Sequence, residues 1–288
     1  MILWPCGGVE GRSLATVFAG LNNLRRVDSF MRRREVTIVA AVNDEVVLSQ
    51  NLKASPDLAT TELIELRSQP SASIAYNAGA RSANSDVLVF AHQDVYLPAG
   101  WIDRLLSAIE RLDKEVSNWG VLGLYGVRPD WSRIGRCWSS GLSRELGAEF
   151  NDFPSIVSAD ELLLVLNAEH DLNFDPSLPG FHLYGTDIVQ TALKQSIGAF
   201  AIHNPVVHNS VPVRSLSGPY TVAYRYLQKK WRAQLPIPTC IVPLTRTGLP
   251  LWTYRALSPL QEAGRIPKPV RPQERLHGQT IAKRLGYE

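Results

Sequence analysis

The chain has 288 residues, of which 45% are hydrophobic and 20% are charged. This composition is typical of a globular protein with a sizeable core, and it excludes disorder as the main state. The 30 Lys and Arg residues against 27 Asp and Glu residues give a net charge of +3 at pH 7, which argues against a dedicated nucleic-acid binder. The 3 cysteines lie far apart in the sequence, so we expect a reducing compartment and neither a disulfide scaffold nor a cysteine-rich zinc module.

Residues 1–35 show no clear period and end in a basic stretch over 25–34. One interpretation of this stretch is a solvated helix or arm, and the other is an electrostatic contact with anionic lipid. No apolar run approaches the roughly 20 residues that span a bilayer. We therefore expect a cytoplasmic protein, with the basic stretch as the candidate for a peripheral contact at the inner face of the membrane.

Regular structure is predicted from residue 36 onward. Residues 36–42 are nearly all apolar, which favours a strand buried on both faces, and Asn43-Asp44 can end this strand and cap a helix. A stripe of apolar side chains follows Pro98 at helical spacing: Trp101, Leu105, Ile109 and Leu112. The elements expected up to residue 127 are strands over 36–42, 61–66, 87–91 and 119–127 and helices over 44–53, 73–83 and from Pro98 onward.

This alternation of strands and helices predicts an α/β domain with a mostly parallel, Rossmann-like sheet flanked by helices. Ligands of such sheets bind beyond the carboxyl ends of the strands. The residues that follow the first and third strands, Asn43–Glu45 and His92–Val95, are therefore the first candidates for a site.

The pattern is less regular after residue 127. Residues 128–155 carry several glycine and tryptophan residues and are predicted to be loop-like. The elements expected beyond them are strand-like segments over 156–167, 199–203 and 206–208 and helices over 186–196 and 220–233. A C-terminal helix followed by an extended, proline-rich tail is the expected end of the chain.

The segment over 73–95 carries the clearest chemistry. It reads as a helix of small residues, a buried strand, and then His92, Gln93 and Asp94 at the end of that strand. An Asp in this place can hold a divalent cation against a diphosphate, or it can simply cap the turn before Pro98. The chain has no P-loop, no G-x-G-x-x-G after the first strand and no G-x-S-x-G, so the corresponding nucleotide-binding and hydrolase interpretations lose their main support.

Five motifs in order resemble the GT-A glycosyltransferases of family 2, and most of all a bacterial branch with an HQDV strand end. The motifs are the strand with N-D-E over 36–45, Asn77-x-Gly with the strand ending in HQDV over 77–95, GFHLYGTD over 180–187, VVHNS over 206–210 and KW with LPI over 230–237. The resemblance covers roughly residues 36–240. It implies a GT-A-like nucleotide-sugar transferase domain over 36–215. We expect an N-terminal basic arm or helix before it (1–35) and a C-terminal helix with a wrapping extension after it (216–288).

The implied activity is metal-dependent transfer of a sugar from a nucleotide-sugar donor to a hydroxyl acceptor, with inversion. The implied cofactor is Mn²⁺ or Mg²⁺, and the expected donor is a UDP-sugar. Saccharide, lipid-linked and protein acceptors all fit, and cell-envelope or capsule glycan synthesis is the implied setting. Arg67 and Ser68 stand where many relatives place an Asp after the second strand, which weakens the case for a uracil base.

The resemblance also assigns roles to residues. Asp94 would be a metal ligand and His208 a second one, arriving from a distant loop; a hydrogen-bonded histidine is the alternative for His208. His92, which replaces the first acid of the usual DxD pair, would ligate the metal, contact phosphate or only pack in the fold. The residues implied against the nucleotide sugar are Asn43, Glu45, Ser73, Asn77, His92, Gln93 and Asp94. Asp187 would be the general base, or alternatively a residue that stabilises the first turn of its helix.

The acceptor side is less defined. Trp131 and Trp138 could stack on a sugar ring or pack in the fold. His182 and Tyr184 lie beside Asp187 in sequence and could orient an acceptor or the donor sugar, or serve as packing residues.

Two other functions remain open at the level of the sequence. A sugar nucleotidyltransferase would usually carry a glycine-rich, basic loop after the first strand, and Asn43-Asp-Glu-Val is neither. A catalytically silent nucleotide-sugar-binding or scaffold protein on the same fold is favoured by the altered DxD position.

Overall fold

The computed structural model describes residues 34–211, 216, 218–262 and 276–288. The arm or helix expected over 1–35 and its basic stretch thus lie almost wholly outside the described residues. Residues from Val36 onward form one compact unit, and the description below concerns that unit.

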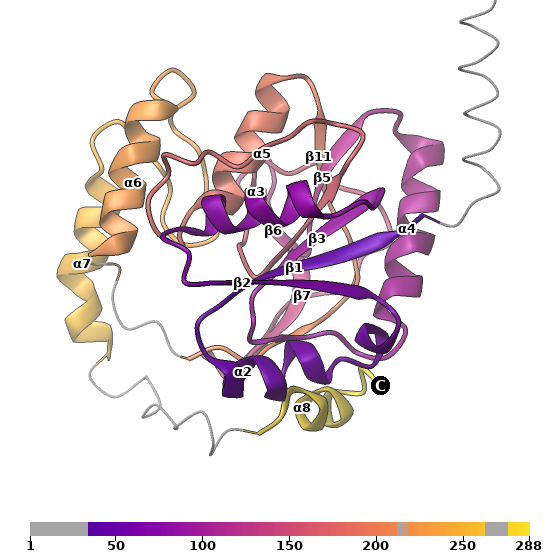
Figure 1. The fold of residues 1–288 in the computed structure, drawn as a ribbon. Helices are drawn as coiled ribbons and strands as arrows, with labels where there is room; N and C mark the ends of the chain where they lie inside the picture. Colours follow the sequence, from indigo (N-terminus) through magenta and orange to yellow (C-terminus); the bar gives the residue numbers. More distant parts are fainter. Residues whose placement is uncertain (1–33, 212–215, 217, 263–275) are drawn as a thin grey trace, which may run out of the picture. The chain divides into compact units, whose positions relative to one another are not determined.

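The central sheet has six strands in the order β11-β5-β10-β3-β1-β2 (Figure 1). β1 pairs in parallel with β2 and β3, β11 pairs in parallel with β5, and β10 runs antiparallel to both β3 and β5. The bounds are β1 Val36–Val42, β2 Glu62–Arg67, β3 Val87–Ala91, β5 Trp119–Gly123, β10 Leu163–Asn167 and β11 Gly198–Ala201. The predicted mostly parallel α/β sheet is confirmed, with β10 as its one reversed strand.

Helices cover both faces of this sheet. Alternate residues of β1 show the division, because Val39 packs with α3, α5 and α6 on one face while Ile38 packs with α2 and α4 on the other. The bounds are α2 Glu45–Gln50, α3 Ala72–Ser82, α4 Trp101–Glu115, α5 Tyr184–Lys194 and α6 Pro219–Lys230. The stripe predicted after Pro98 is fully buried, with Trp101, Leu105, Ile109 and Leu112 at 0% exposure. Periodicity therefore located α4 and the face that it buries.

A second sheet was not expected from the sequence. Its order is β4-β12-β7-β6-β9, and β8 pairs with β7. The bounds are β4 Val95–Tyr96, β6 Tyr125–Val127, β7 Arg133–Ser139, β8 Arg144–Gly147, β9 Ser158–Ala159 and β12 Val207–His208. The single strand predicted over 119–127 is wrong, since β5 and β6 belong to different sheets, and the loop predicted over 128–155 contains β7 and β8.

Glycines explain why 128–155 looked like a loop. A Cβ on Gly135 would lie 2.3 Å from the Leu124 carbonyl oxygen, and one on Gly147 would lie 1.7 Å from that of Gly135. Both residues have positive φ, of 138° and 77°, a backbone conformation that glycine adopts freely. These glycines let strands approach closely and twist, so they belong to the sheet and do not interrupt it.

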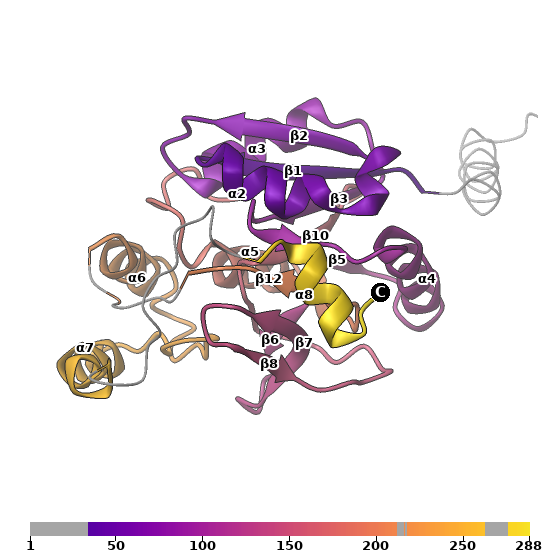
Figure 2. The same cartoon turned by 90° about the horizontal axis from the view of Figure 1, so that it is seen from below.

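The C-terminal region is more helical than predicted. After α6, the helices α7 (Leu249–Glu262) and α8 (Gly278–Leu285) lie where an extended tail was expected. Residues 263–275, which hold much of the proline-rich sequence, lie outside the described residues. α8 packs on β4 and β12, where Ile281 and Ala282 join Tyr96 and Val207 in one apolar cluster (Figure 2). None of the helices in the described residues is long and apolar enough to cross a membrane.

Candidate metal and donor site

Three side chains converge beyond the carboxyl end of β3. His92 follows β3 directly, Asp94 lies in the turn to β4, and His208 ends β12. β12 pairs antiparallel with β4, and the Asn209 N–H donates to the Asp94 carbonyl at 2.8 Å. This pairing brings His208, 114 residues further along the chain, to within 3.4 Å of Asp94, measured from Nε2 to Oδ1. His92 Nδ1 lies 3.9 Å from the same oxygen.

The cluster fits a divalent cation. One ligand atom from each of His92, Asp94 and His208 lies within 4.8 Å of the others. Such spacings suit ligand atoms held about 2.0–2.2 Å from a shared ion. Asp94 Oδ1 is buried and makes no hydrogen bond to any described residue, and a buried polar atom without a partner needs an explanation. A cation bound between the two imidazoles and this oxygen would explain why Asp94 Oδ1 has no hydrogen-bond partner.

A hydrogen-bond chain fixes which nitrogen of His92 is free. The Tyr184 hydroxyl donates to the Glu161 carbonyl at 2.9 Å, so its oxygen is left to accept from His92 Nε2, which lies 2.8 Å away. His92 then carries its proton on Nε2 and presents the Nδ1 lone pair toward Asp94. Partners of this kind orient metal-binding histidines in proteins. Tyr184 begins α5 and is 2% exposed, so its position is set by the core.

The three side chains of the cluster shift one another's pKa values. Burial opposes ionisation of Asp94, but the interaction with the neighbouring His208 outweighs it and lowers the pKa of the Asp94 carboxyl to about 2. Burial lowers the pKa of His92, which favours the neutral imidazole that metals require. Burial also acts to lower the pKa of His208, but the Asp94 charge reverses the effect and raises it.

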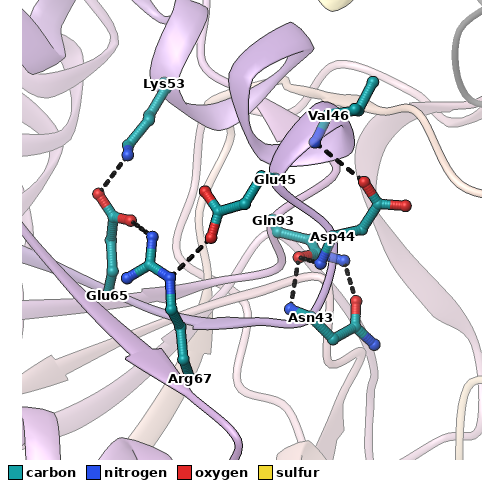
Figure 3. A network of polar contacts seen from close by, with 8 residues as sticks. All are labelled: Asn43, Asp44, Glu45, Val46, Lys53, Glu65, Arg67 and Gln93. Carbon is teal, nitrogen blue, oxygen red and sulfur yellow. Dashed lines mark hydrogen bonds and ion pairs between the residues drawn. The ribbon is translucent and has the colours of Figure 1, made fainter.

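Gln93 ties the turn after β1 to the turn after β3 (Figure 3). Its Oε1 accepts from the backbone N–H groups of Asn43 and Asp44 at 3.0 and 3.1 Å, and its Nε2 donates to Asn43 Oδ1. Asp44 in turn caps α2 through the N–H groups of Val46 and Val47. The first candidates from the sequence, the residues after β1 and after β3, are thus joined into one edge of the site.

Glu45 and Arg67 form an exposed ionic chain on this edge (Figure 3). Arg67 Nε lies 2.6 Å from Glu45 Oε1, Arg67 also bonds Glu65, and Lys53 Nζ lies 2.7 Å from Glu65 Oε1. The hydrogen bond from Arg67 lowers the pKa of Glu45. Arg67 therefore binds the carboxylate of Glu45, which the sequence predicted as a nucleotide-sugar contact.

Two predicted contacts on α3 are buried. The Asn77 amide is committed to the backbone of Phe174, donating to its carbonyl at 2.7 Å and accepting from its N–H at 2.9 Å. Ser73 is 1% exposed, and its hydroxyl makes no hydrogen bond to a described residue. Asn77 thus holds a distant segment against α3, and the nucleotide role of both residues stays a prediction.

Both carboxylate oxygens of Asp187, the predicted general base, accept a hydrogen bond. It is 2% exposed, and its carboxylate accepts from Lys230 Nζ at 2.8 Å and from Trp231 Nε1 at 2.7 Å. Lys230 Nζ also lies 2.8 Å from Asp175 Oδ2. Burial raises the pKa of Asp187, while Lys230 and Trp231 act in the opposite direction. The ion pair joins α5 to the end of α6, and its contacts are those of a structural group.

Two acidic residues that the sequence interpretation missed lie beside the cluster. Asp160 and Glu161 precede β10, and the Leu162 carbonyl accepts from the His92 N–H at 3.0 Å. Burial and the neighbouring Asp160 raise the pKa of the partly exposed Glu161 well above its ordinary value. Because β10 is antiparallel, its start lies at the carboxyl edge of the other strands. The two adjacent acids can be seen in the sequence, but their place at the site follows from the direction of β10, which the sequence pattern did not give.

The remaining candidates lie on other parts of the fold. His182 is half-buried with its ring against Tyr220, at 5.5 Å between centroids. Trp131 is 50% exposed in the β6–β7 turn. Trp138 on β7 is half-buried, packs against the α8 cluster and bonds Ser140 Oγ at 3.2 Å. The structure brings Tyr184 to His92, and the acceptor roles of the other three stay predictions.

No family model matches the chain, and no curated protein matches it. Solved structures with similar folds include the mannosyltransferase PcManGT from Pyrobaculum calidifontis in complex with GDP-Man and Mn²⁺, at 13% identity and a TM-score of 0.43, over 93% of this chain and 78% of that one. S. aureus TarS 1–349 with UDP-GlcNAc has 8% identity and a TM-score of 0.44, over 70% and 67% of the two chains. Glucosyl-3-phosphoglycerate synthase from Mycobacterium tuberculosis, with Mg²⁺ and UDP, has 11% identity and a TM-score of 0.42, over 77% and 85%. At these levels of similarity, the functions of those proteins are not assigned to this chain.

Proposed function

We propose that this protein is a metal-dependent glycosyltransferase of the GT-A type, which transfers a sugar from a nucleotide-sugar donor to a hydroxyl acceptor. The observation that carries the proposal is the cluster of His92, Asp94 and His208 beyond the carboxyl end of β3, with the buried Asp94 Oδ1 lacking a hydrogen-bond partner among the described residues. Ligands of α/β sheets bind at this edge.

His92, Asp94 and His208 would hold the ion, which when bound supplies charge neutralisation for a departing diphosphate. Two imidazole nitrogens and one carboxylate oxygen are a softer donor set than the all-oxygen sites that Mg²⁺ favours. We therefore propose Mn²⁺ or a similar transition metal in preference to Mg²⁺. Tyr184 keeps the His92 Nδ1 lone pair directed at the site, and Gln93 holds the neighbouring turn after β1.

Two residues are candidates for the general base. The family resemblance proposes Asp187, which in this structure is 2% exposed and bonded on both oxygens. Glu161 is partly exposed and lies beside the cluster, and burial together with the neighbouring Asp160 raises its pKa well above its ordinary value. The contacts favour Glu161. Whichever residue is the base, its amide variant should lower turnover about 10²- to 10⁴-fold while donor binding persists.

The finer assignments rest on the family resemblance: inversion, a UDP-sugar donor, a saccharide, lipid-linked or protein acceptor, and a cytoplasmic role in envelope or capsule glycan synthesis. The pairing of Arg67 with Glu45 leaves an arginine near the proposed nucleotide edge, so the base of the donor nucleotide is a point for experiment. A silent nucleotide-sugar-binding protein is the alternative function.

The test is a thermal-shift screen of UDP-, GDP-, CMP- and dTDP-sugars with Mn²⁺, with Mg²⁺ and with EDTA, followed by detection of released nucleoside diphosphate. We expect one nucleotide class to raise the melting temperature in the presence of Mn²⁺ only, since a ligand of the native state stabilises it. Asp94→Ala should lose this shift and the turnover, while Asp152→Ala, at an exposed carboxylate, should keep both.

Binding that survives EDTA and Asp94→Ala would contradict the metal site. A metal-dependent shift without turnover for any acceptor class would favour the silent-binding alternative. No shift with any donor would reject the proposed function.

A further inference from the structure

The outward face of α7 is apolar. Leu249, Trp252 and Leu257 are 58%, 67% and 50% exposed, and their spacing of three and then five residues places them on one side of the helix. Leu251, on the opposite side, is 6% exposed and packs into the core with α6. α7 thus buries one apolar face and exposes a second, and exposed apolar patches of this kind mark interaction sites.

The neighbouring surface of α6 is basic. Arg225 and Lys229 are exposed at a spacing of four residues, one turn beyond the 54% exposed Val222. Arg246 is exposed in the connection between the two helices. Residues 219–262 contain six Lys and Arg residues and one acidic residue, whereas the whole chain has a net charge of only +3. Positive charge is therefore concentrated in the region that also exposes the apolar stripe.

The two helices are neighbours, and hydrogen bonds join α6 to the segment that leads into α7. Figures 1 and 2 both place α6 beside α7 at one end of the molecule. Tyr224 of α6 donates through its hydroxyl to the Pro243 carbonyl, and Gln228 donates to the carbonyls of Thr245 and Arg246 just before α7. These hydrogen bonds hold α6 against the connection to α7. The helix that carries the apolar side chains and the helix that carries the basic ones are therefore fixed relative to each other.

We propose that the α6–α7 face, defined by Leu249, Trp252, Leu257, Arg225, Lys229 and Arg246, docks on an anionic lipid surface. An interfacial helix buries Trp and Leu side chains at the boundary between headgroups and acyl chains, and flanking basic residues attract anionic headgroups. Trp suits this boundary because its ring is apolar and its N–H is polar. A second copy of the chain would be a poorer partner, because a symmetric contact would oppose like charges.

The proposal differs from the sequence-based suggestion of a lipid contact through residues 25–34, and it does not depend on the proposed enzymatic activity. The test is co-sedimentation of the full chain with phosphatidylcholine vesicles and with vesicles that also contain phosphatidylglycerol. We expect binding to the anionic vesicles only. It should weaken at least tenfold as ionic strength rises from about 0.1 M to about 1 M, since the screening length falls from about 10 Å to about 3 Å.

Two variants separate the apolar and ionic contributions. Trp252→Ala should weaken binding to anionic vesicles about tenfold, whereas Leu142→Ala, at a leucine that is 57% exposed in the β7–β8 turn, should not change it. The double variant Arg225→Glu/Lys229→Glu should lose the preference for phosphatidylglycerol. Its control, Arg81→Glu/Lys114→Glu, has the same net charge at exposed positions of α3 and α4.

Unchanged binding in both test variants would overturn the proposal and leave the basic N-terminal stretch as the lipid contact. Equal binding to neutral vesicles, or no binding to either kind, would also overturn it. Light scattering of the chromatographed protein provides the last check: a dimer that Trp252→Ala dissociates would show that the face joins copies of this chain instead.

Discussion

Two aspartates of the site region, Asp187 at 2% exposure and Asp94 with its side chain 19% exposed, differ in how their oxygens are satisfied. Asp187 accepts hydrogen bonds from Lys230 and Trp231, so each carboxylate oxygen has a donor. Asp94 lies between two imidazoles, and its Oδ1 has no hydrogen bond to a described residue. A satisfied buried carboxylate stabilises packing, whereas an unsatisfied one is a place for a ligand. We therefore expect Asp187 to stabilise the fold, and we propose Asp94 as the metal ligand of the two.

The largest expected effect on stability is at Asp187. Asp187→Ala would leave the Lys230 ammonium with one partner, Asp175, and the Trp231 N–H with none that the structure shows. Removing one partner of a buried ion pair costs about 3–5 kcal/mol, and we expect a loss of about 3 kcal/mol in the free energy of unfolding, measured by urea denaturation. Asp187→Asn should lose less, because the amide oxygen still accepts a bond. If Asp187→Asn were as stable as the wild type and inactive, Asp187 would be the base.

Metal binding should give the next largest effect. Mn²⁺ at 100 times its dissociation constant stabilises a native state that binds it by about 2.7 kcal/mol. We expect this gain in denaturation curves of the wild type, and its loss in His208→Ala and Asp94→Ala. Asp152→Ala serves as the control. A gain that persists in both ligand variants would place the metal elsewhere and remove the contrast between the two aspartates.

The sequence predicted the framework of the site but not its full composition. Apolar runs and periodicity located β1, β3 and α4, and a strand-end argument drew attention to Asp94. The direction of β10 depends on pairing with β3 and β5, which are remote in sequence, so the position of Asp160 and Glu161 could not be inferred from local pattern. The contact between Asp187 and Trp231 likewise depends on how α6 packs.

A smaller effect is expected at Tyr184, which would act on the proposed metal only through His92. Tyr184→Phe removes the acceptor for the His92 Nε2 proton and leaves the aromatic packing with Tyr76 and Phe174 in place. Loss of such a partner typically weakens metal binding 10- to 100-fold, which calorimetric titration with Mn²⁺ would measure. Tyr76→Phe, a matched loss of a buried hydroxyl that lies 3.4 Å from the Tyr184 hydroxyl, should have a clearly smaller effect. Equal losses in the two variants would indicate general core damage.

The smallest change is expected for Asp94→Ala in EDTA. Without metal, the wild-type side chain gains from the His208 charge but leaves a buried oxygen without a hydrogen bond, and these two contributions to the free energy of unfolding oppose each other. We expect the variant to unfold within about 1 kcal/mol of the wild type, the range of a single ordinary hydrogen bond. Urea denaturation of both proteins in EDTA measures the difference. A loss as large as that of Asp187→Ala would mean that Asp94 is satisfied by the protein itself, and the two aspartates would then belong to one structural class.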